Sequence, residues 1–190
     1  MSRPSITYRP LTSQNWEDLE LLFGPSGACG GCWCMFWRTS RAEFARRGNV
    51  GNRQDFRTLV DKATPTGIVA YLDGQPAGWV SVAPRETYPS LERSRILKRV
   101  DDQPVWSIVC FYVAREDRHT GLMAGLIGAA VDFAASQGAR YVEAYPTDPA
   151  VRSRSPAEAY MGVLPTFEKA GFIEIARPRP ERAIVRRSIG

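Results

Sequence analysis

The stretch "FYVAREDRHTGLMAGL", residues 111–126, joins an apolar run to a segment of helical periodicity through a short charged turn. The apolar run begins at Pro104 and is rich in β-branched and aromatic residues, which predicts a strand buried on both faces. From Gly121 the apolar residues recur at helical spacing until Gly138, which predicts a helix that ends there. The first amides of such a helix are unpaired and carry the positive end of its dipole, so the junction can hold an anion.

The segments on either side of this junction predict a sheet. The stretch "ARYVEAYP", residues 139–146, has the composition of a second buried strand. A strand, a crossover helix and a strand at this spacing predict a right-handed βαβ unit with parallel strands. Upstream, two apolar runs meet at Asp73 and Gly74, a strong turn pair, and predict an antiparallel hairpin. The sequence therefore predicts an α/β fold with a mixed sheet.

The two ends of the chain add further elements. A short first strand is expected over residues 6–10, followed by a helix with one apolar face. Two more helices are expected before residue 66, and Gly48 separates them. Residues 155–171 predict another helix, interrupted near Gly162, and two short strands are expected after it.

Composition and charge limit the class of protein. A chain of 190 residues with 44% apolar and 24% charged residues has the composition of one ordinary globular domain. The net charge of +5 suits an anionic ligand, but acids stand among the bases, and the basic stretches at residues 93–99 and 177–187 are interpreted as solvated surface. A nucleic-acid partner is therefore not favoured. Neither a signal segment nor a membrane-spanning run is visible, so a cytoplasmic protein without a membrane partner is expected.

The order of these elements resembles a known family. The hairpin, the long apolar strand, the R-x-x-G motif of Arg118 and Gly121, the strand "YVEAYP" and the late "FEKAGF" resemble, in that order, the GNAT superfamily of acetyl-CoA-dependent N-acetyltransferases. The likeness spans roughly residues 68–186, and more loosely the N-terminal elements. It implies a GNAT-like mixed, mostly antiparallel sheet with a central parallel βαβ unit flanked by helices.

The resemblance also implies an organisation and a reaction. It implies one domain over residues 1–190, in which residues 1–66 cover the acceptor site and residues 67–190 form the cofactor-binding core and the C-terminal strands. It implies acetyl-CoA as co-substrate, and a small-molecule or peptide amine as acceptor. No metal is expected. Sheet edges pair into homodimers in many proteins of this type, and the sequence leaves the oligomeric state open.

For acetyl-CoA, the resemblance points to the central strand and the loop that follows it. The pyrophosphate would sit on the loop of residues 118–121, and the pantetheine arm would run along the strand of residues 110–113. Main-chain groups of Phe111 and Val113 would pair with the pantetheine or polarise the thioester carbonyl. The expected cofactor-binding residues are Cys110, Phe111, Tyr112, Val113, Arg118, His119, Thr120, Gly121, Leu122, Met123 and Ala124.

Two positions depart from the family pattern. The pattern reads R-x-x-G-x-G or R-x-x-G-x-A, and Met123 stands where the small residue is expected. The tyrosine that often protonates the departing thiolate, four residues before the late glycine, is Phe167 here. Either Tyr160 or Tyr145 replaces it, or no side-chain acid is used. The alternative to an enzyme is a degenerate acyl-CoA-binding or protein-interaction module without turnover.

The acceptor amine needs a group that takes its proton, because a lysine-like amine is almost entirely protonated at neutral pH. Glu143, on the second buried strand, is the first candidate for this general base, and an ion pair with a nearby arginine is the alternative interpretation. Glu86, after the hairpin, is the second candidate. His119, the only histidine, lies inside the phosphate-loop motif, which favours a phosphate contact or an exposed side chain over catalysis.

The stretch "ACGGCWCMFW", residues 28–37, holds three of the four cysteines and two of the five tryptophans. Its cysteines fall one ligand short of a closed zinc site, and Cys110 or His119 would have to supply the fourth. A disulfide is disfavoured in a reducing compartment. The third interpretation is packing, in which the aromatic residues wall the core or an acceptor pocket. The expected pocket residues are Cys32, Trp33, Trp37 and Glu86.

Overall fold

The computed structural model describes residues 4–118, 120–151 and 160–190. Its strands form one seven-stranded sheet in the order β1-β2-β3-β4-β5-β7-β6, with β4 in the middle. β4 and β5 are parallel, and every other neighbouring pair is antiparallel. The predicted α/β class, with a mixed and mostly antiparallel sheet around a parallel βαβ unit, is confirmed. The strands are β1 (Ile6–Pro10), β2 (Gly67–Leu72), β3 (Gln75–Pro84), β4 (Trp106–Val113), β5 (Tyr141–Ala144), β6 (Ile173–Arg179) and β7 (Arg182–Ser188).

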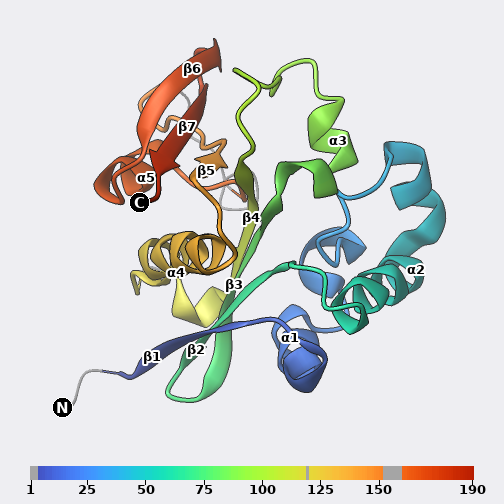
Figure 1. Ribbon diagram of the computed structural model, residues 1–190. Helices are drawn as coiled ribbons and strands as arrows, with labels where there is room; N and C mark the ends of the chain where they lie inside the picture. The colour runs from blue at the N-terminus through green and yellow to red at the C-terminus, as the bar shows by residue number, and fades with distance from the viewer. Residues whose placement is uncertain (1–3, 119, 152–159) are drawn as a thin grey trace.

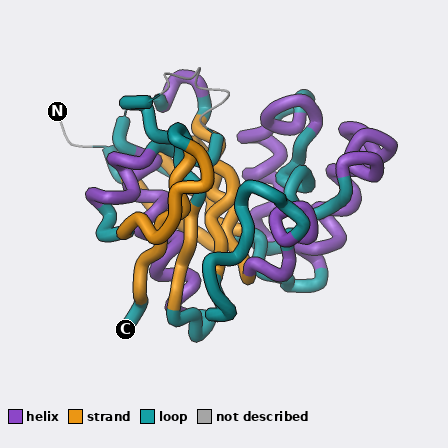
Figure 2. The backbone as a smooth tube through the Cα atoms, turned by 90° about the horizontal axis from the view of Figure 1, so that it is seen from above, coloured by secondary structure: helices purple, strands orange, loops and turns teal. Residues whose placement is uncertain are grey.

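Helices cover both faces of the sheet. Figure 1 shows α1 and α2 on one side of the strands and α4 on the other, and Figure 2 shows helices on both sides from above. Strand β4 therefore runs between two helical layers, which explains its nearly continuous apolar sequence. The α-helices in the described residues are α1 (Trp16–Phe23), α2 (Arg41–Asp61), α3 (Pro89–Glu92), α4 (Leu122–Ser136) and α5 (Leu164–Lys169).

Side chains of the central strands alternate between two apolar cores, because successive residues of a strand point to opposite faces. On β3, Val80 packs into the core beneath α4, and Trp79 packs into the core beneath α1 and α2. On β4, Phe111 lies on the α4 side, whereas Cys110 and Tyr112 face the N-terminal helices. Each layer is therefore anchored to the sheet by its own set of side chains.

Two glycine-dependent turns shape the chain as the sequence indicated. Asp73 and Gly74 join β2 to β3 with φ of 49° and 81°, the left-handed values that a two-residue hairpin turn requires. At Gly48, φ is 59° and ψ is −166°, which kinks α2. The two helices expected on either side of Gly48 are therefore the two halves of α2. Of the helix expected over residues 155–171, the described part is α5, and residues 152–159 lie outside the described residues.

The parallel pair β4 and β5 separates part of the way along β4. Their pairing ends at Ile108 and Ala144. The register of β4 against β3 then jumps from Ile108 to Cys110, so Val109 is left as a bulge. A bulge bends its strand and increases the local twist. Beyond Val109, β4 is no longer paired with β5, and the place beside this unpaired part of β4, on the side away from β3, is called the gap.

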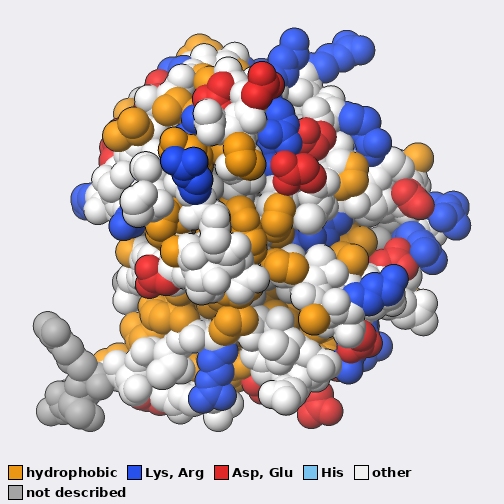
Figure 3. Space-filling view, in the orientation of Figure 1, with side chains coloured by type: hydrophobic (Ala, Val, Ile, Leu, Met, Phe, Trp, Pro, Cys, Tyr) orange, Lys and Arg blue, Asp and Glu red, His pale blue; other side chains and the backbone are white. Residues whose placement is uncertain are grey.

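The surface shows charge of both signs. On the face seen in Figure 3, Lys and Arg side chains are interspersed with Asp and Glu and do not form one continuous basic patch. Across the described ranges, no helix combines the length and the apolar character that crossing a bilayer requires.

The contact between α4 and β1 gives a first testable prediction. A Cβ atom added to Gly125 would lie 1.8 Å from the hydroxyl oxygen of Tyr8, whereas one added to Gly128 would meet no atom within 4 Å. Alanine favours a helix over glycine by about 1 kcal/mol, so Gly128→Ala is expected to stabilise the protein. In Gly125→Ala, displacement of Tyr8 offsets that gain, and we expect this variant to be about 1–3 kcal/mol less stable than Gly128→Ala. Urea unfolding of both variants measures the difference. Equal urea midpoints for the two variants would show that the Tyr8 side chain moves aside at no cost in stability.

Candidate active site

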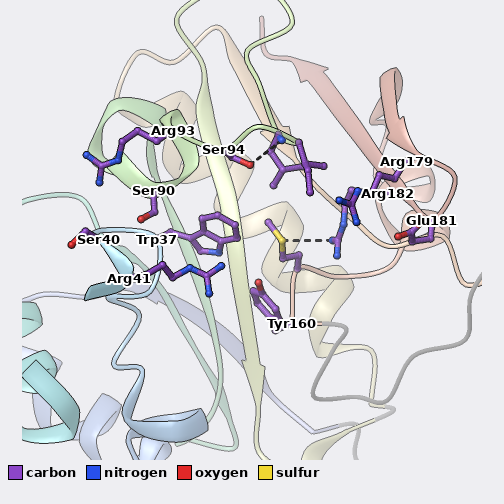
Figure 4. Close-up of a pocket in the computed structure, with 13 residues that line it drawn as sticks. Trp37, Ser40, Arg41, Ser90, Arg93, Ser94, Tyr160, Arg179, Glu181 and Arg182 are labelled. Carbon is purple, nitrogen blue, oxygen red and sulfur yellow. Dashed lines mark hydrogen bonds between the residues drawn. The ribbon is translucent and has the colours of Figure 1, made fainter. Parts of the chain in front are cut away.

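Two adjacent cavities lie beside β4. The first, of about 310 Å³, is lined by residues of the 28–37 loop, by Phe44 and Tyr160, and by β4, and is called the inner cavity. The second, of about 520 Å³, is lined by the start of α2, the segment around and after α3, and the β6–β7 hairpin, and is called the outer cavity. Figure 4 shows the outer cavity. Trp37 and Tyr160 line both cavities, so the two spaces adjoin each other.

The inner cavity lies against the part of β4 that has left β5. Its wall on this strand begins at the bulge, Val109, and continues to Tyr112. The N–H of Phe111 points away from β3 and donates to the carbonyl of Tyr160 at 2.6 Å. The carbonyl of Val113 accepts a hydrogen bond from Nε of Arg118 at 3.3 Å. The gap between β4 and β5 is therefore lined by main-chain polar groups on one side.

The N–H of Val113 is the main-chain donor best placed for a ligand in this gap. Residues two apart in a strand direct their N–H groups to the same side, so Val113 directs its N–H to the gap as Phe111 does. Phe111 is available to a ligand only after its bond to Tyr160 opens. The resemblance implied the same role for both residues, and in the structure the N–H of Phe111 already has the carbonyl of Tyr160 as its partner.

The start of α4 is open. Gly121 precedes the helix with φ of 86°, and among the described residues no side chain caps the helix there. A Cβ atom on Gly121 would meet no atom within 4 Å. The hydroxyl of Thr120 donates to the carbonyl of Asp117 at 2.6 Å, which holds the turn. Unpaired amides at an open helix start fit a phosphate group.

The other residues expected in the phosphate loop are placed as follows. Arg118 and Ala124 are exposed, and Leu122 is buried. Met123, which replaces the small residue of the family pattern, packs partly buried against the core beneath α4. His119 lies outside the described residues. The methionine thus contributes to the packing of α4 on the sheet.

Glu143 belongs to a buried polar network. Its side chain is 2% exposed and accepts hydrogen bonds from Arg186 at 2.6 and 3.0 Å and from the hydroxyl of Tyr145 at 3.2 Å. The fully buried Arg85 lies 3.7 Å from Glu143 and donates to the hydroxyl of Tyr145 at 2.7 Å. Burial, with the charge of Glu143, raises the pKa of Tyr145. Glu143 and Tyr145 line neither cavity, and the ion pair that the sequence left open as the alternative for Glu143 is present.

Replacing Glu143 distinguishes a role in stabilising the fold from a role as the general base. Glu143→Gln is expected to lower the free energy of unfolding by about 1–3 kcal/mol, because Arg186 loses a buried charged acceptor. We expect turnover per folded molecule to stay within a few-fold of the unsubstituted protein. Urea unfolding and steady-state rates measure the two effects. A turnover loss of about 100-fold with unchanged stability would instead identify Glu143 as the general base.

Tyr160 is the candidate acid that the structure places at the cavities. It lines both of them, and burial, reinforced by the neighbouring Cys110, raises its pKa above the usual 10.0. The phenol is therefore protonated at neutral pH and can donate. Phe167, at the position of the family tyrosine, is fully buried and packs on Phe111 with ring centroids 6.0 Å apart.

All four cysteines line the inner cavity, so the fold brings Cys110 to the loop cysteines. Burial raises the pKa of Cys32 to about 12. A hydrogen bond with Cys34, together with burial, raises the pKa of Cys110 well above 9.0. The four thiols are free, and within residues 4–118, 120–151 and 160–190 no group of three or more His, Cys, Asp or Glu is placed to hold a metal. The raised pKa values of Cys32 and Cys110 suit an apolar wall better than thiolate chemistry.

The remaining expected pocket residues divide between cavity, core and surface. Cys32 and Trp37 line the inner cavity. Trp33 is 3% exposed, stacks on Trp16 with ring centroids 6.1 Å apart, and lines neither cavity. Glu86 is exposed, pairs with Arg99 at 3.2 Å, and also lines neither cavity.

The outer cavity contains functional candidates that sequence reasoning missed. Four arginines line it, and three of them come from the two basic stretches interpreted as solvated surface. Arg93 and Arg179 are exposed, as that interpretation expects, and Arg182 is half-buried; what the interpretation did not anticipate is that all three line one cavity. The stretches themselves were the available signal, but nothing local indicates that they face one cavity. The arginines are Arg41, Arg93, Arg179 and Arg182.

Comparisons with known proteins agree with this fold. The profile of the acetyltransferase (GNAT) family matches residues 33–163. The fold is similar to the acetyltransferase of the GNAT family from Streptococcus pneumoniae, at 12% identity and a TM-score of 0.53, over 98% of this chain and 100% of that chain. It is also similar to the PaiA N-acetyltransferase from Thermoplasma acidophilum in complex with coenzyme A, at 13% identity and a TM-score of 0.52, over 97% and 99% of the two chains.

A third similar structure is an N-acetyltransferase from Staphylococcus aureus Mu50, at 12% identity and a TM-score of 0.55, over 97% of this chain and 98% of that chain. A search of curated proteins found no significant match. At 12–13% identity, these similar structures are evidence for the fold alone. The family profile covers more than half of the 190 residues, from the cysteine-rich loop through the open start of α4 to the segment that carries Tyr160. The chain belongs to the GNAT family of acetyltransferases.

Proposed function

We propose that the protein transfers the acetyl group of acetyl-CoA to an amine acceptor by direct attack in a ternary complex. The observation that carries the proposal is the gap between β4 and β5, which begins at the Val109 bulge, where the wall that β4 contributes to the inner cavity also begins. Membership of the GNAT family supports the same reaction. The acceptor would reach the gap from the inner and outer cavities, which lie on the side of the N-terminal helices.

The residues present fit acetyl-CoA at two points. The open start of α4 at Gly121 offers unpaired amides to a pyrophosphate, and the exposed Arg118 adds a charge-assisted contact. The N–H of Val113 faces the gap, where it can pair with a pantetheine amide. Arg118 donates to the carbonyl of Val113, so it connects the proposed pyrophosphate contact to the proposed pantetheine contact.

Bound acetyl-CoA supplies the acetyl group as a thioester, so a carbon–nitrogen bond forms at the acceptor while the carbon–sulfur bond breaks. Tyr160 donates its phenolic proton to the departing sulfur, because its raised pKa keeps that proton in place at neutral pH. The acceptor nitrogen, which starts as an ammonium, loses two protons in all: one passes to solvent through the outer cavity before the attack, and the one released after the carbon–nitrogen bond forms restores the phenol of Tyr160. In this proposal Glu143 holds Arg186 and does not act as the base.

A calorimetric titration with acetyl-CoA, and separately with CoA, tests the first requirement of this function. We expect one molecule of acetyl-CoA to bind per chain with micromolar affinity. CoA is expected to bind similarly, since the proposed pyrophosphate and pantetheine contacts are shared. The absence of binding by either molecule would contradict the proposal.

A further inference from the structure

The outer cavity concentrates positive charge. Four arginines line it against one glutamate, Glu181. Figure 4 shows Arg41 and Arg93 on one side of the cavity and Arg179 and Arg182 on the other. The first two come from the start of α2 and the segment after α3, and the last two from the β6–β7 hairpin. Cations that line one cavity repel each other unless an anion lies between them.

In the part of the chain that the structure describes, three of these arginines have no carboxylate partner. Among the described residues no ion pair joins Arg41, Arg93 or Arg179 to an acid. Arg41 instead stacks over Phe36, 4.2 Å from the ring centroid, and Phe36 lines the inner cavity. By contrast, Arg177 on β6 has two carboxylate partners. The outer cavity is therefore lined by guanidinium groups that, among the described residues, have no carboxylate partner, and Figure 4 shows the Arg93 side chain extending away from Arg179 and Arg182.

Uncharged hydrogen-bond donors in the wall of the outer cavity also favour an anionic ligand. The hydroxyl oxygens of Ser40 and Ser94, both in the cavity wall, accept main-chain N–H bonds at 3.2 and 3.0 Å. Each hydroxyl therefore still has its proton to donate. Nε1 of Trp37, at the border of the two cavities, is buried and has no hydrogen-bond partner among the described residues. Guanidinium, hydroxyl and indole donors together match a carboxylate or a phosphate.

We infer that the acceptor is a small amine that also carries a carboxylate or phosphate group, which binds among Arg41, Arg93 and Arg179. This inference rests on the proposed acetyl transfer. Because Tyr160 lies where the two cavities meet, an acceptor held by its anionic group in the outer cavity presents its amine toward the proposed transfer point. The same charges repel polycationic amines, so the site selects against them.

Matched pairs of amines test the inference. Acetylation rates are measured for glutamate against glutamine, and for glucosamine 6-phosphate against glucosamine. We expect the anionic member of at least one pair to be preferred by about 10-fold or more in kcat/KM. The first pair detects a carboxylate and the second a phosphate. Equal rates within both pairs, or a preference for the neutral members, would overturn the inference.

A double variant, Arg93→Gln with Arg179→Gln, tests whether the preference for anionic amines arises in the outer cavity. We expect KM for the preferred anionic amine to rise about 10-fold or more with kcat little changed. The affinity for acetyl-CoA should be unchanged. Arg140→Gln, a matched change of an exposed arginine that lines neither cavity, should behave as the unsubstituted protein. Undiminished use of the anionic amine by the double variant would overturn the inference.

Direct titration with the same amines separates this inference from the proposed function. Anionic amines that bind to the unsubstituted protein and not to the double variant support the anion site even without turnover. Binding without any acetylation would contradict the acetyl-transfer proposal alone. Acetylation of amines with no anionic preference would contradict the anion site alone.

Discussion

Substituting glutamate for Gly121 is expected to weaken acetyl-CoA binding by about 100-fold or more and to abolish turnover with it. A Cβ atom at Gly121 meets no other atom within 4 Å, so the added side chain has room at the start of α4. Its carboxylate would lie close to the first amides of the helix, where the proposed pyrophosphate binds. Repulsion between the carboxylate and the pyrophosphate adds to competition for the same donors. Titration calorimetry measures the loss.

Gly138→Glu is the matched control. Gly138 follows the opposite end of α4 and has φ of 79° against 86° for Gly121, and a Cβ atom there would likewise meet no atom within 4 Å. Both variants therefore place the same side chain in a left-handed conformation that favours glycine. The helix of 15 residues separates the two sites by roughly 22 Å, so Gly138→Glu should bind acetyl-CoA normally. An equal loss in both variants would assign the effect to backbone strain and contradict the phosphate site.

Replacing Tyr160 by phenylalanine is expected to lower kcat by about 100-fold or more while the affinity for acetyl-CoA stays the same. The variant keeps the ring at the border of the two cavities and removes the proton that the departing sulfur receives. Since burial raises the pKa of Tyr160 above 10.0, the acid is present at neutral pH and is lost only as the pH rises through that raised value. Steady-state rates across pH should therefore show an alkaline decline that Tyr160→Phe lacks.

Tyr145→Phe provides the comparison for this prediction. The hydroxyl of Tyr145 accepts from Arg85 at 2.7 Å and lies 2.8 Å from the hydroxyl of Ser107. Its removal leaves buried partners unsatisfied, so we expect a loss of about 1–3 kcal/mol of stability with kcat unchanged. The reverse pattern, with turnover lost in Tyr145→Phe and kept in Tyr160→Phe, would identify Tyr145 as the general acid.

The parts of the fold that could be predicted are those with local signals. The Asp73-Gly74 turn and the change from strand to helix at Gly121 specify the hairpin and the βαβ unit directly. The bulge at Val109 could not be predicted, because a one-residue slip in register leaves no trace in composition or periodicity. The gap that supports the proposed function depends on that bulge.

The same contrast holds for the site. The open helix start could be predicted because its residues are contiguous in the sequence. The partner of Glu143 is Arg186, directly opposite on β7, and that pairing follows from a strand register that no local pattern specifies. The arginines of the outer cavity and the meeting of Cys110 with the loop cysteines likewise depend on segments far apart in the chain. The acceptor side of the site is therefore visible only in the folded structure.

The central claim is that the protein moves an acetyl group from acetyl-CoA to an amine. Its most direct test is to incubate the unsubstituted protein with acetyl-CoA carrying an isotopically labelled acetyl group and the amines named above, and to detect products by mass spectrometry. We predict a labelled amide on at least one amine, dependent on the protein and strongly reduced in Tyr160→Phe. Binding of acetyl-CoA with no labelled amide on any amine would contradict the claim and favour a binding module without turnover.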